Sequence, residues 1–337
     1  MTAVPTARDL VRVFPDFGSV DRVEPLAGDG SARRFYRVFV GEETRVLLEG
    51  PDPMENGAYV RITRHLAACG VRVPRVFGVW EEGGWILLED LGDRSLFRAL
   101  RAPGADPVAL YRPVLDLLVR MQVDGARGFR LETGFAPRPY DERTMVEDEG
   151  LYFAREFAQG VLGLAVPAGF RTDLERLAAR VPPGARGYFL HRDFQSRNVH
   201  LTPEGPAAID FQGARPGPLA YDAAALILDP YADLPGRVRE VLLEEYRNRL
   251  VAAGALRGWT EEAWIACGTF RLLQALGAFG KLGWRLGKPG FREHAPAALR
   301  TLEHHLAPVA RRFPHLAETV ARAREALERS GKSPCET

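Results

Sequence analysis

One short stretch of the chain combines side chains whose types and spacing suit phosphoryl transfer. Asp193 follows His191 and Arg192, Asn198 comes shortly after, and Asp210 follows a second apolar run. An aspartate can orient an attacking hydroxyl and accept its proton, while an asparagine and a second aspartate can hold Mg²⁺ on nucleotide phosphates. The three positions agree with the kinase pattern H-R-D-x-x-x-x-N followed by D-F. We therefore predict that Asp193 is catalytic and that Asn198 and Asp210 bind the metal.

A β-hairpin is expected to bring the two metal-binding side chains together. Residues 202–206 have the composition of a turn, and the apolar runs on either side are predicted strands. Symmetric pairing about this turn puts Leu201 opposite Ala207, and therefore Asn198 opposite Asp210. Directly opposed residues of an antiparallel pair have Cβ atoms about 5 Å apart. A cation that prefers oxygen ligands should then fit between the amide and the carboxylate.

Other residues in or near this stretch are predicted to support the chemistry. Arg197 lies inside the catalytic loop, where a guanidinium can contact the transferred phosphoryl group, and we predict a catalytic role for it. His191 is predicted to support the loop structurally. Asp222 is predicted to cap the helix that follows it and to tie back to the loop. A lone H-R-D tripeptide is common by chance, so the combined spacing carries the prediction.

The composition is that of a globular protein with no strong charge bias. The chain has 337 residues, of which 46% are hydrophobic and 26% charged, and this length suggests two domains. Lys plus Arg number 45 against 44 for Asp plus Glu, which argues against nucleic acid or an acidic membrane as a partner. The three cysteines have no metal-binding spacing and suit a reducing compartment. No signal-like or membrane-spanning apolar run is present, so a cytoplasmic protein is expected.

The chain is predicted to be strand-rich at first and helical afterwards, which indicates an α+β fold with two lobes. Tyr59, Ile62 and Leu66 share one face of a helix that should end at Gly70. Strands or extended segments are expected over 34–40, 44–48, 71–76 and 85–88, and helices over 111–121, 148–161, 174–181, 261–286 and 297–306. The predicted boundaries are a lead-in helix in 1–23, a nucleotide-binding lobe in 24–92 with a hinge at 89–92, a helical lobe in 93–330 with the catalytic loop and acceptor site, and a flexible tail in 331–337.

With these motifs, the sequence resembles the aminoglycoside phosphotransferase and choline kinase family, a small-molecule branch of the protein-kinase-like fold. Within it, the chain looks most similar to the bacterial kinases that phosphorylate N-acetylmuramate and N-acetylglucosamine at C1 in cell-wall recycling. The resemblance implies a bilobal fold with a small β-rich N-lobe and a larger helical C-lobe, ATP or GTP as donor with Mg²⁺, and an amino sugar as acceptor. Gln212 departs from the glycine of the protein-kinase pattern. The resemblance is carried by Gly30–Val38, Leu88–Gly92, Asp210–Gln212, Gly217–Pro218, Tyr221–Asp222 and Gln274–Phe279.

The same resemblance implies where the nucleotide binds. Glu89, Asp90 and Leu91 would form the hinge whose backbone meets adenine. A glycine-rich loop would lie over the phosphates, since backbone N–H groups can approach anionic oxygens where no Cβ intervenes. The residues of this loop are Gly28, Asp29, Gly30 and Ser31.

One part of the kinase template is missing. The strand at 44–49 has no lysine to pair with the phosphates and a helix glutamate, so the expected partner Glu55 has no obvious mate. The amino-sugar kinases look similar in this respect. Our hypothesis is that Arg34 or Arg37 of the first strand supplies the positive charge.

The acceptor is expected to bind to the helical lobe. We predict acceptor-binding roles for Glu147, Tyr152, Glu156 and Arg143, because sugar sites combine apolar faces with a few orienting polar groups. The alternative is that the aromatic ring packs in the core and the acids form a solvated face. Arginines such as Arg143 and Arg197 suit a lactyl carboxylate. The scarcity of acids elsewhere favours a neutral or anionic sugar over a polycationic aminoglycoside.

Two other functions remain open from the sequence. One is the same chemistry on another acceptor, such as an aminoglycoside, a choline-like or a homoserine-like alcohol. The other is a nucleotide-binding pseudokinase, which the missing lysine favours and the intact Asp193, Asn198 and Asp210 disfavour. The expected oligomeric state is a monomer or weak dimer.

Overall fold

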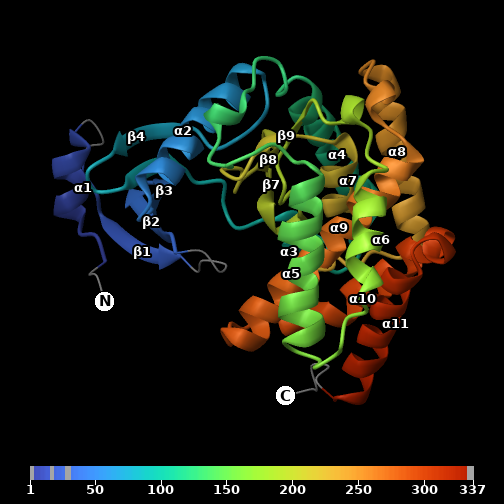
Figure 1. The fold of residues 1–337 in the computed structure, drawn as a ribbon. Coiled ribbons are helices and arrows are strands. Elements are labelled where there is room, and N and C mark those ends of the chain that lie inside the picture. Colours follow the sequence, from blue (N-terminus) through green and yellow to red (C-terminus); the bar gives the residue numbers. More distant parts are fainter. Residues whose placement is uncertain (1–3, 16–18, 27–31, 332–337) are drawn as a thin grey trace.

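The chain folds into an N-terminal β-sheet region and a mostly helical remainder, as the ribbon of the computed structural model shows (Figure 1). The structure describes residues 4–15, 19–26 and 32–331. The predicted α+β, protein-kinase-like architecture is confirmed. No helix in these ranges is long and apolar enough to cross a bilayer.

The N-terminal sheet has five antiparallel strands in the order β1-β2-β3-β5-β4. The strands predicted at 34–40, 44–48 and 85–88 are confirmed, while β1 was not predicted and β4 begins where the predicted extended segment ends. Gly41 (φ +58°) helps to form the tight β2–β3 turn, a conformation that suits glycine. The strands are β1 Arg22–Leu26, β2 Arg34–Val40, β3 Glu43–Glu49, β4 Val76–Trp80 and β5 Trp85–Glu89, with the small pairs β6 Tyr188–Leu190 and β9 Arg215–Gly217, and β7 Val199–Thr202 and β8 Gly205–Ala208.

The helix α2 (Pro53–Ala68) is present where the sequence predicts it. Asp52 caps its N-terminus by accepting backbone N–H groups, and proline follows at the first helical position. Tyr59, Ile62 and Leu66 are buried on one face, and Gly70 (φ +72°) follows the end of the helix. Glu55 lies in the first turn of this helix.

The helical region is built around two buried helices, α7 and α9. Every residue of α7 is buried, and α9 packs against α7 and α10. The helix predicted at 148–161 exists but begins earlier and contains wide π-helical turns. The α-helices are α1 Ala7–Val13, α2 Pro53–Ala68, α3 Leu96–Ala99, α4 Pro107–Val123, α5 Leu151–Phe153, α6 Gly169–Ala178, α7 Leu219–Ile227, α8 Gly236–Ala252, α9 Glu261–Phe279, α10 Ala295–Leu306 and α11 Pro314–Arg329. The π-helical segments are η3 Thr144–Gly150, η4 Ala154–Gln159 and η8 Gly280–Arg285, and the 3₁₀ turns are η2 Leu131–Thr133, η5 Pro183–Ala185, η6 Ser196–Asn198, η7 Leu256–Gly258, η9 Arg292–His294 and η10 Ala307–Arg312.

Aromatic packing anchors the central stretch between the two regions. Phe189, Phe194 and Phe211 are fully buried and flank the polar residues of the catalytic loop and the hairpin. The ring of Tyr59 on α2 stacks on Phe211, with centroids 4.9 Å apart and planes inclined by 16°. The helix that carries Glu55 is therefore packed directly against the residue that follows Asp210.

Candidate active site

The β7–β8 hairpin has a shorter turn than predicted, and its register is shifted by one residue. Thr202 pairs with Gly205, so the turn contains only two residues, and the predicted pairing of Asn198 with Asp210 is wrong. Instead, the N–H of Ile209 donates to the Asn198 carbonyl over 3.0 Å. The cause is local: the Thr202 hydroxyl donates to the Gly205 carbonyl (2.8 Å), and Gly205 takes φ +112°.

The two predicted metal-binding residues lie just outside the paired strands. Asn198 ends the turn η6, and its Nδ2 donates to the Asp193 carbonyl over 2.9 Å. This bond turns the amide oxygen of Asn198 away from the Asp193 carbonyl. The amide oxygen is therefore left free to act as an acceptor. Asp210 has φ +66°, an uncommon left-handed conformation for a residue with a side chain. Both residues supply the oxygen ligands that magnesium prefers.

Asp222 holds the backbone of the catalytic loop. Its two carboxylate oxygens accept the N–H groups of His191 (2.7 Å) and Arg192 (2.9 Å). Arg192 has φ +83°, so these bonds stabilise a strained conformation directly before Asp193. Burial raises the pKa of Asp222 to about 7. The predicted tie to the loop is present, but Asp222 lies inside α7 and does not cap it.

His191 contacts backbone on both sides of its ring. The N–H of Asp193 donates to His191 Nδ1 over 3.3 Å, and the other ring nitrogen, Nε2, lies 2.9 Å from the Ile209 carbonyl. Burial lowers the pKa of His191, which favours the neutral ring with its proton on Nε2. This ring joins the catalytic loop to the residue before Asp210, consistent with the supporting role predicted for it.

Two further contacts define the other end of the loop. Asp229, which the sequence analysis did not single out, accepts from the backbone N–H (2.8 Å) and hydroxyl (2.5 Å) of Ser196. The guanidinium carbon of Arg197 lies 4.0 Å from the centroid of the Tyr231 ring and 4.8 Å from that of Phe97. This aromatic packing holds Arg197 in a defined position, and a catalytic role for it stays a prediction.

A cation that the sequence analysis did not identify faces Asp210. Arg33 lies directly before β2 and is 6% exposed. Its Nη2 donates to Asp210 Oδ1 over 2.5 Å, and its Nε lies 3.8 Å from Glu55 Oε1. Arg33 therefore bridges the predicted metal-binding aspartate and Glu55, the glutamate that the missing lysine left without a partner.

The arginines proposed for that role from the sequence lie elsewhere. Arg34 pairs with Glu49 over 2.8 Å, and Arg37 binds Asp90 and Asp93. A direct nucleotide role for either of them stays a prediction. The glycine-rich loop predicted to cover the phosphates, Gly28, Asp29, Gly30 and Ser31, lies outside the described residues.

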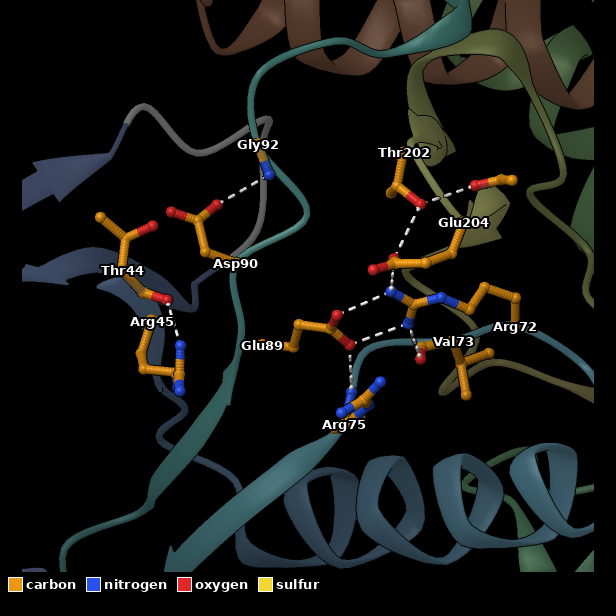
Figure 2. Close-up of polar contacts among 11 residues, drawn as sticks. Thr44, Arg45, Arg72, Val73, Arg75, Glu89, Asp90, Gly92, Thr202 and Glu204 are labelled. Atoms are coloured by element: carbon orange, nitrogen blue, oxygen red, sulfur yellow. Dashed lines mark hydrogen bonds and ion pairs between the residues drawn. The ribbon is translucent and has the colours of Figure 1, made fainter. Parts of the chain in front are cut away.

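The hinge is held by a second arginine. Arg72 donates to both oxygens of Glu89 over 2.6 and 2.8 Å and to Glu204 over 2.9 Å, and Figure 2 shows its guanidinium between these two carboxylates. Pairing of β5 with β3 ends at Glu89, so the backbone of Asp90 and Leu91 lies beyond the paired strand. Their backbone groups are therefore not used in the sheet, and the predicted contact with adenine stays a prediction.

The predicted acceptor residues do not form one cluster. Glu147 and Arg143 are exposed, and Glu147 pairs with Arg171 over 2.7 Å. Glu156 is 7% exposed and pairs with Arg155 and Arg285. Tyr152 is half-buried, and this burial raises the pKa of its hydroxyl. Their acceptor roles stay predictions.

A fully buried acid in the same segment was missed. Glu149 accepts from the hydroxyls of Tyr140 and Tyr221, each over 2.6 Å. Burial raises its pKa to about 7, against the opposing influence of Arg192 and the two hydrogen bonds. No pattern distinguishes Glu149 from the neighbouring acids in the sequence, because its partners come from other segments.

The family model of the phosphotransferase enzyme family matches residues 22–264, which span the sheet, the hinge, the catalytic loop and the hairpin. The chain belongs to this family. It is 32% identical over 91% of its length to an N-acetylmuramate/N-acetylglucosamine kinase of Pseudomonas aeruginosa, covering 89% of that protein. It is 27% identical over 88% of its length to a kinase of the same name from Neisseria meningitidis, covering 87% of it.

Solved structures agree with this membership at the level of the fold. A choline kinase from Streptococcus pneumoniae superposes with a TM-score of 0.58 at 12% identity, over 89% of this chain and 98% of that one. A putative aminoglycoside phosphotransferase from Ralstonia eutropha gives 0.59 at 14% identity, over 94% and 96%. The chain is therefore a small-molecule kinase, and a phosphotransferase of this family takes its phosphoryl group from ATP.

The described side chains fit a metal that is shared with the nucleotide. Within the described ranges, no group of three or more His, Cys, Asp or Glu is arranged to hold a metal by itself. The phosphotransferase instead offers one amide and one carboxylate, Asn198 and Asp210. Magnesium in nucleotide-dependent enzymes is bound by one or two side chains together with phosphate oxygens, so this small donor set fits it.

Proposed function

We propose that the protein is an ATP-dependent kinase that phosphorylates the anomeric hydroxyl of N-acetylmuramate or N-acetylglucosamine. The observation that carries the proposal is the 32% identity to the Pseudomonas aeruginosa kinase of these sugars over 91% of the chain. The supported fold and the short loop that joins Asp193 to Asn198 agree with it. GTP as an alternative donor remains part of the proposal.

The proposed reaction uses one carboxylate for the proton and two side chains for the metal. Asp193 orients the acceptor hydroxyl and takes its proton as the new oxygen–phosphorus bond forms and the bond to the ADP oxygen breaks. Asn198 and Asp210 would hold Mg²⁺, which would neutralise charge on the phosphates. The Asn198 amide is oriented for this role by its bond to the Asp193 carbonyl.

Arg33 completes the proposed nucleotide site. In the kinase template a lysine joins the phosphates to a helix glutamate. Here the short Arg33–Asp210 contact and the Arg33–Glu55 pair supply a buried cation at the corresponding place. The missing lysine was the argument for a pseudokinase. Because Arg33 supplies a cation at the corresponding place, that argument loses most of its force.

The proposed setting is the recycling of cell-wall sugars in the cytoplasm by a monomer or weak dimer. Cys69 and Cys267 are free thiols, which suits a reducing compartment. This setting rests on the named relatives and on the cysteine content.

Product analysis tests the proposal. The protein is incubated with Mg-ATP and each sugar, and the product is examined by ³¹P NMR for coupling of phosphorus to the anomeric proton. We expect a sugar 1-phosphate and equimolar ADP, and no product from Asp193→Asn. A 6-phosphate would contradict the position, and ADP release only with choline-like alcohols or aminoglycosides would contradict the acceptor.

A further inference from the structure

The helix α9 brings a buried arginine to the catalytic aspartate. Arg271 is 5% exposed, and its Nη2 lies 3.7 Å from Asp193 Oδ1. This distance is an ion pair but too long for a hydrogen bond. The positive charge therefore acts on Asp193 while the carboxylate oxygen keeps its lone pairs for a hydroxyl proton.

Arg271 also determines how two nearby glutamine amides are oriented. Its Nη2 donates to Gln195 Oε1 over 3.0 Å, and its Nη1 donates to Gln274 Oε1. A guanidinium has only donors, so both amides must turn their oxygens toward it. Their NH₂ groups therefore point away from Arg271. Within the described chain, neither of these NH₂ groups has a recorded hydrogen-bond partner.

The exposed positions of α9 lie on the same side as Arg271. Between Arg271 and Phe279, only Gln274 and Ala278 are partly exposed, and their four-residue spacing puts them on one face of the helix. Gly277 lies one turn after Gln274. A Cβ at this position would lie 2.5 Å from the ring of Tyr152, so glycine is needed for the ring to pack there. This strip of α9 therefore runs from Asp193 to Tyr152, a predicted acceptor residue.

We propose that Arg271 selects acceptors without positive charge, and that it does so as a positioning residue for Asp193 and Gln274. This inference rests on the proposed function. In a 2-amino sugar, the nitrogen is attached to the carbon next to the anomeric carbon, so a free ammonium would sit within a few ångströms of the reacting oxygen. There it would face the fixed charge of Arg271 and the NH₂ group of Gln274, both of which repel a cation. An N-acetyl group is neutral, and its carbonyl oxygen can accept from the Gln274 amide.

The test compares N-acetylglucosamine with glucosamine as acceptors at about pH 6, where the amine is protonated. The kcat/KM for each sugar is measured in the wild type, Arg271→Gln and Arg271→Lys. We expect the wild type to prefer the acetylated sugar and Arg271→Gln to reduce that preference on the order of 10- to 100-fold. Arg271→Lys should retain most of it, because the charge is kept. A merely structural role would not follow the charge in this way.

A matched control comes from another arginine with the same local features. Arg239 on α8 pairs with Asp233 over 3.5 Å and, like Arg271, has a buried Nε without a recorded partner among the described residues. Arg239→Gln should leave the preference between the two sugars unchanged. If the Arg271 variants unfold, Gln274→Glu on the partly exposed strip is used instead. This substitution replaces the hydrogen-bond donor by an acceptor, so it should raise kcat/KM for glucosamine relative to N-acetylglucosamine.

The outcomes separate the two proposals. One outcome is that the wild type phosphorylates these sugars and Arg271→Gln leaves the preference between them unchanged. This result would overturn the role of Arg271 and leave the proposed function intact. Where the arginine variants do not fold, an unchanged preference in Gln274→Glu has the same meaning. No turnover of either sugar by the wild type would overturn the proposed function and this inference with it.

Discussion

The arginines of the hinge and those beside the catalytic aspartate are matched with carboxylates in opposite ways. Arg37 is shared by Asp90 and Asp93, and Arg72 by Glu89 and Glu204, through hydrogen bonds of 2.6 to 3.2 Å. The hydrogen bond from Arg37 holds the pKa of Asp93 below its usual range. At the predicted hinge, the positive charges of Arg37 and Arg72 are thus both engaged by carboxylates, and these pairs hold the hinge in place.

The arginines near Asp193 retain unmatched capacity. Arg192 and Arg271 each have a buried Nε without a hydrogen-bond partner in the described chain, and Arg271 contacts Asp193 only at ion-pair distance. A buried donor left unsatisfied opposes folding. The difference teaches that the hinge arginines fix the shape of this enzyme through matched carboxylates, whereas the two arginines beside Asp193 retain charge that can act on the reacting groups.

The comparison is sharpest at Asp193, which no hinge arginine contacts. Asp193→Asn removes the proton acceptor while preserving shape, so turnover should fall about 10³- to 10⁴-fold with nucleotide affinity retained. Acceptor-dependent ADP release and a nucleotide titration measure the two quantities. Asp233→Asn, whose carboxylate pairs with Arg239 and Arg300 and has no part in the proposed chemistry, is the control. Near-normal turnover in Asp193→Asn would end the assignment of this residue.

Arg33 should behave as a functional cation, unlike the hinge arginines. Losing a charge-assisted hydrogen bond costs about 2 kcal/mol, so Arg33→Ala should lower kcat/KM for ATP on the order of 30-fold. Arg33→Lys should recover part of the loss. Steady-state kinetics at varied ATP measures this, with Arg34→Ala for comparison. A larger effect from Arg34→Ala than from Arg33→Ala would return the role to Arg34.

Substitutions at the hinge should change the free energy of unfolding more than the turnover of the enzyme. Arg72→Ala leaves the half-buried Glu89 without its bidentate partner and should lower the free energy of unfolding by about 1 to 2 kcal/mol. Urea denaturation measures it. Glu204→Ala should cost less, because the Glu204 side chain is 63% exposed and solvent screens its pair. Equal losses from the two variants would show that Glu89 does not need Arg72.

A further effect on stability, one that depends on pH, is expected at Glu149. Its pKa is raised to about 7 in the folded protein, so its contribution to stability is present below its unfolded pKa of about 4.3 and is lost as pH rises through 7. Glu149→Gln should therefore gain stability relative to the wild type over that range, by at most about 1.4 kcal/mol per pH unit. Thermal unfolding midpoints at several pH values test this. Glu147→Gln should not show this gain, because Arg171 lowers the pKa of Glu147. A constant difference between Glu149→Gln and the wild type would contradict the raised pKa.

Local pattern was sufficient for the class of chemistry and for most of the fold. Asp193, Asn198 and Asp210 lie within one stretch, and the strands around the β2–β3 turn and the helix that ends near Gly70 follow from periodicity and turn residues. The hairpin register could not be predicted, because one side-chain bond from Thr202 shortens the turn and shifts every pair by one residue.

What depends on distant contacts was out of reach. Arg33 meets Asp210 across 177 residues of sequence, so only the folded chain shows which of the neighbouring arginines faces the aspartate. Glu149 differs from Glu147 only through burial by Tyr140 and Tyr221. Asp222 lies within its helix because its carboxylate is used on the catalytic loop instead of on the helix N-terminus.

Arg72 also contacts the β7–β8 hairpin at two separated points, and these contacts connect the hairpin to the hinge strand. Its carbonyl accepts from the N–H of Ala208 over 3.1 Å, and its guanidinium holds Glu204 at the hairpin tip (Figure 2). The same guanidinium holds Glu89, and Asp210 lies two residues beyond Ala208. Arg72 thus ties the hinge strand to the hairpin that leads to Asp210, so we expect a displacement of the hinge strand to be passed on to this aspartate.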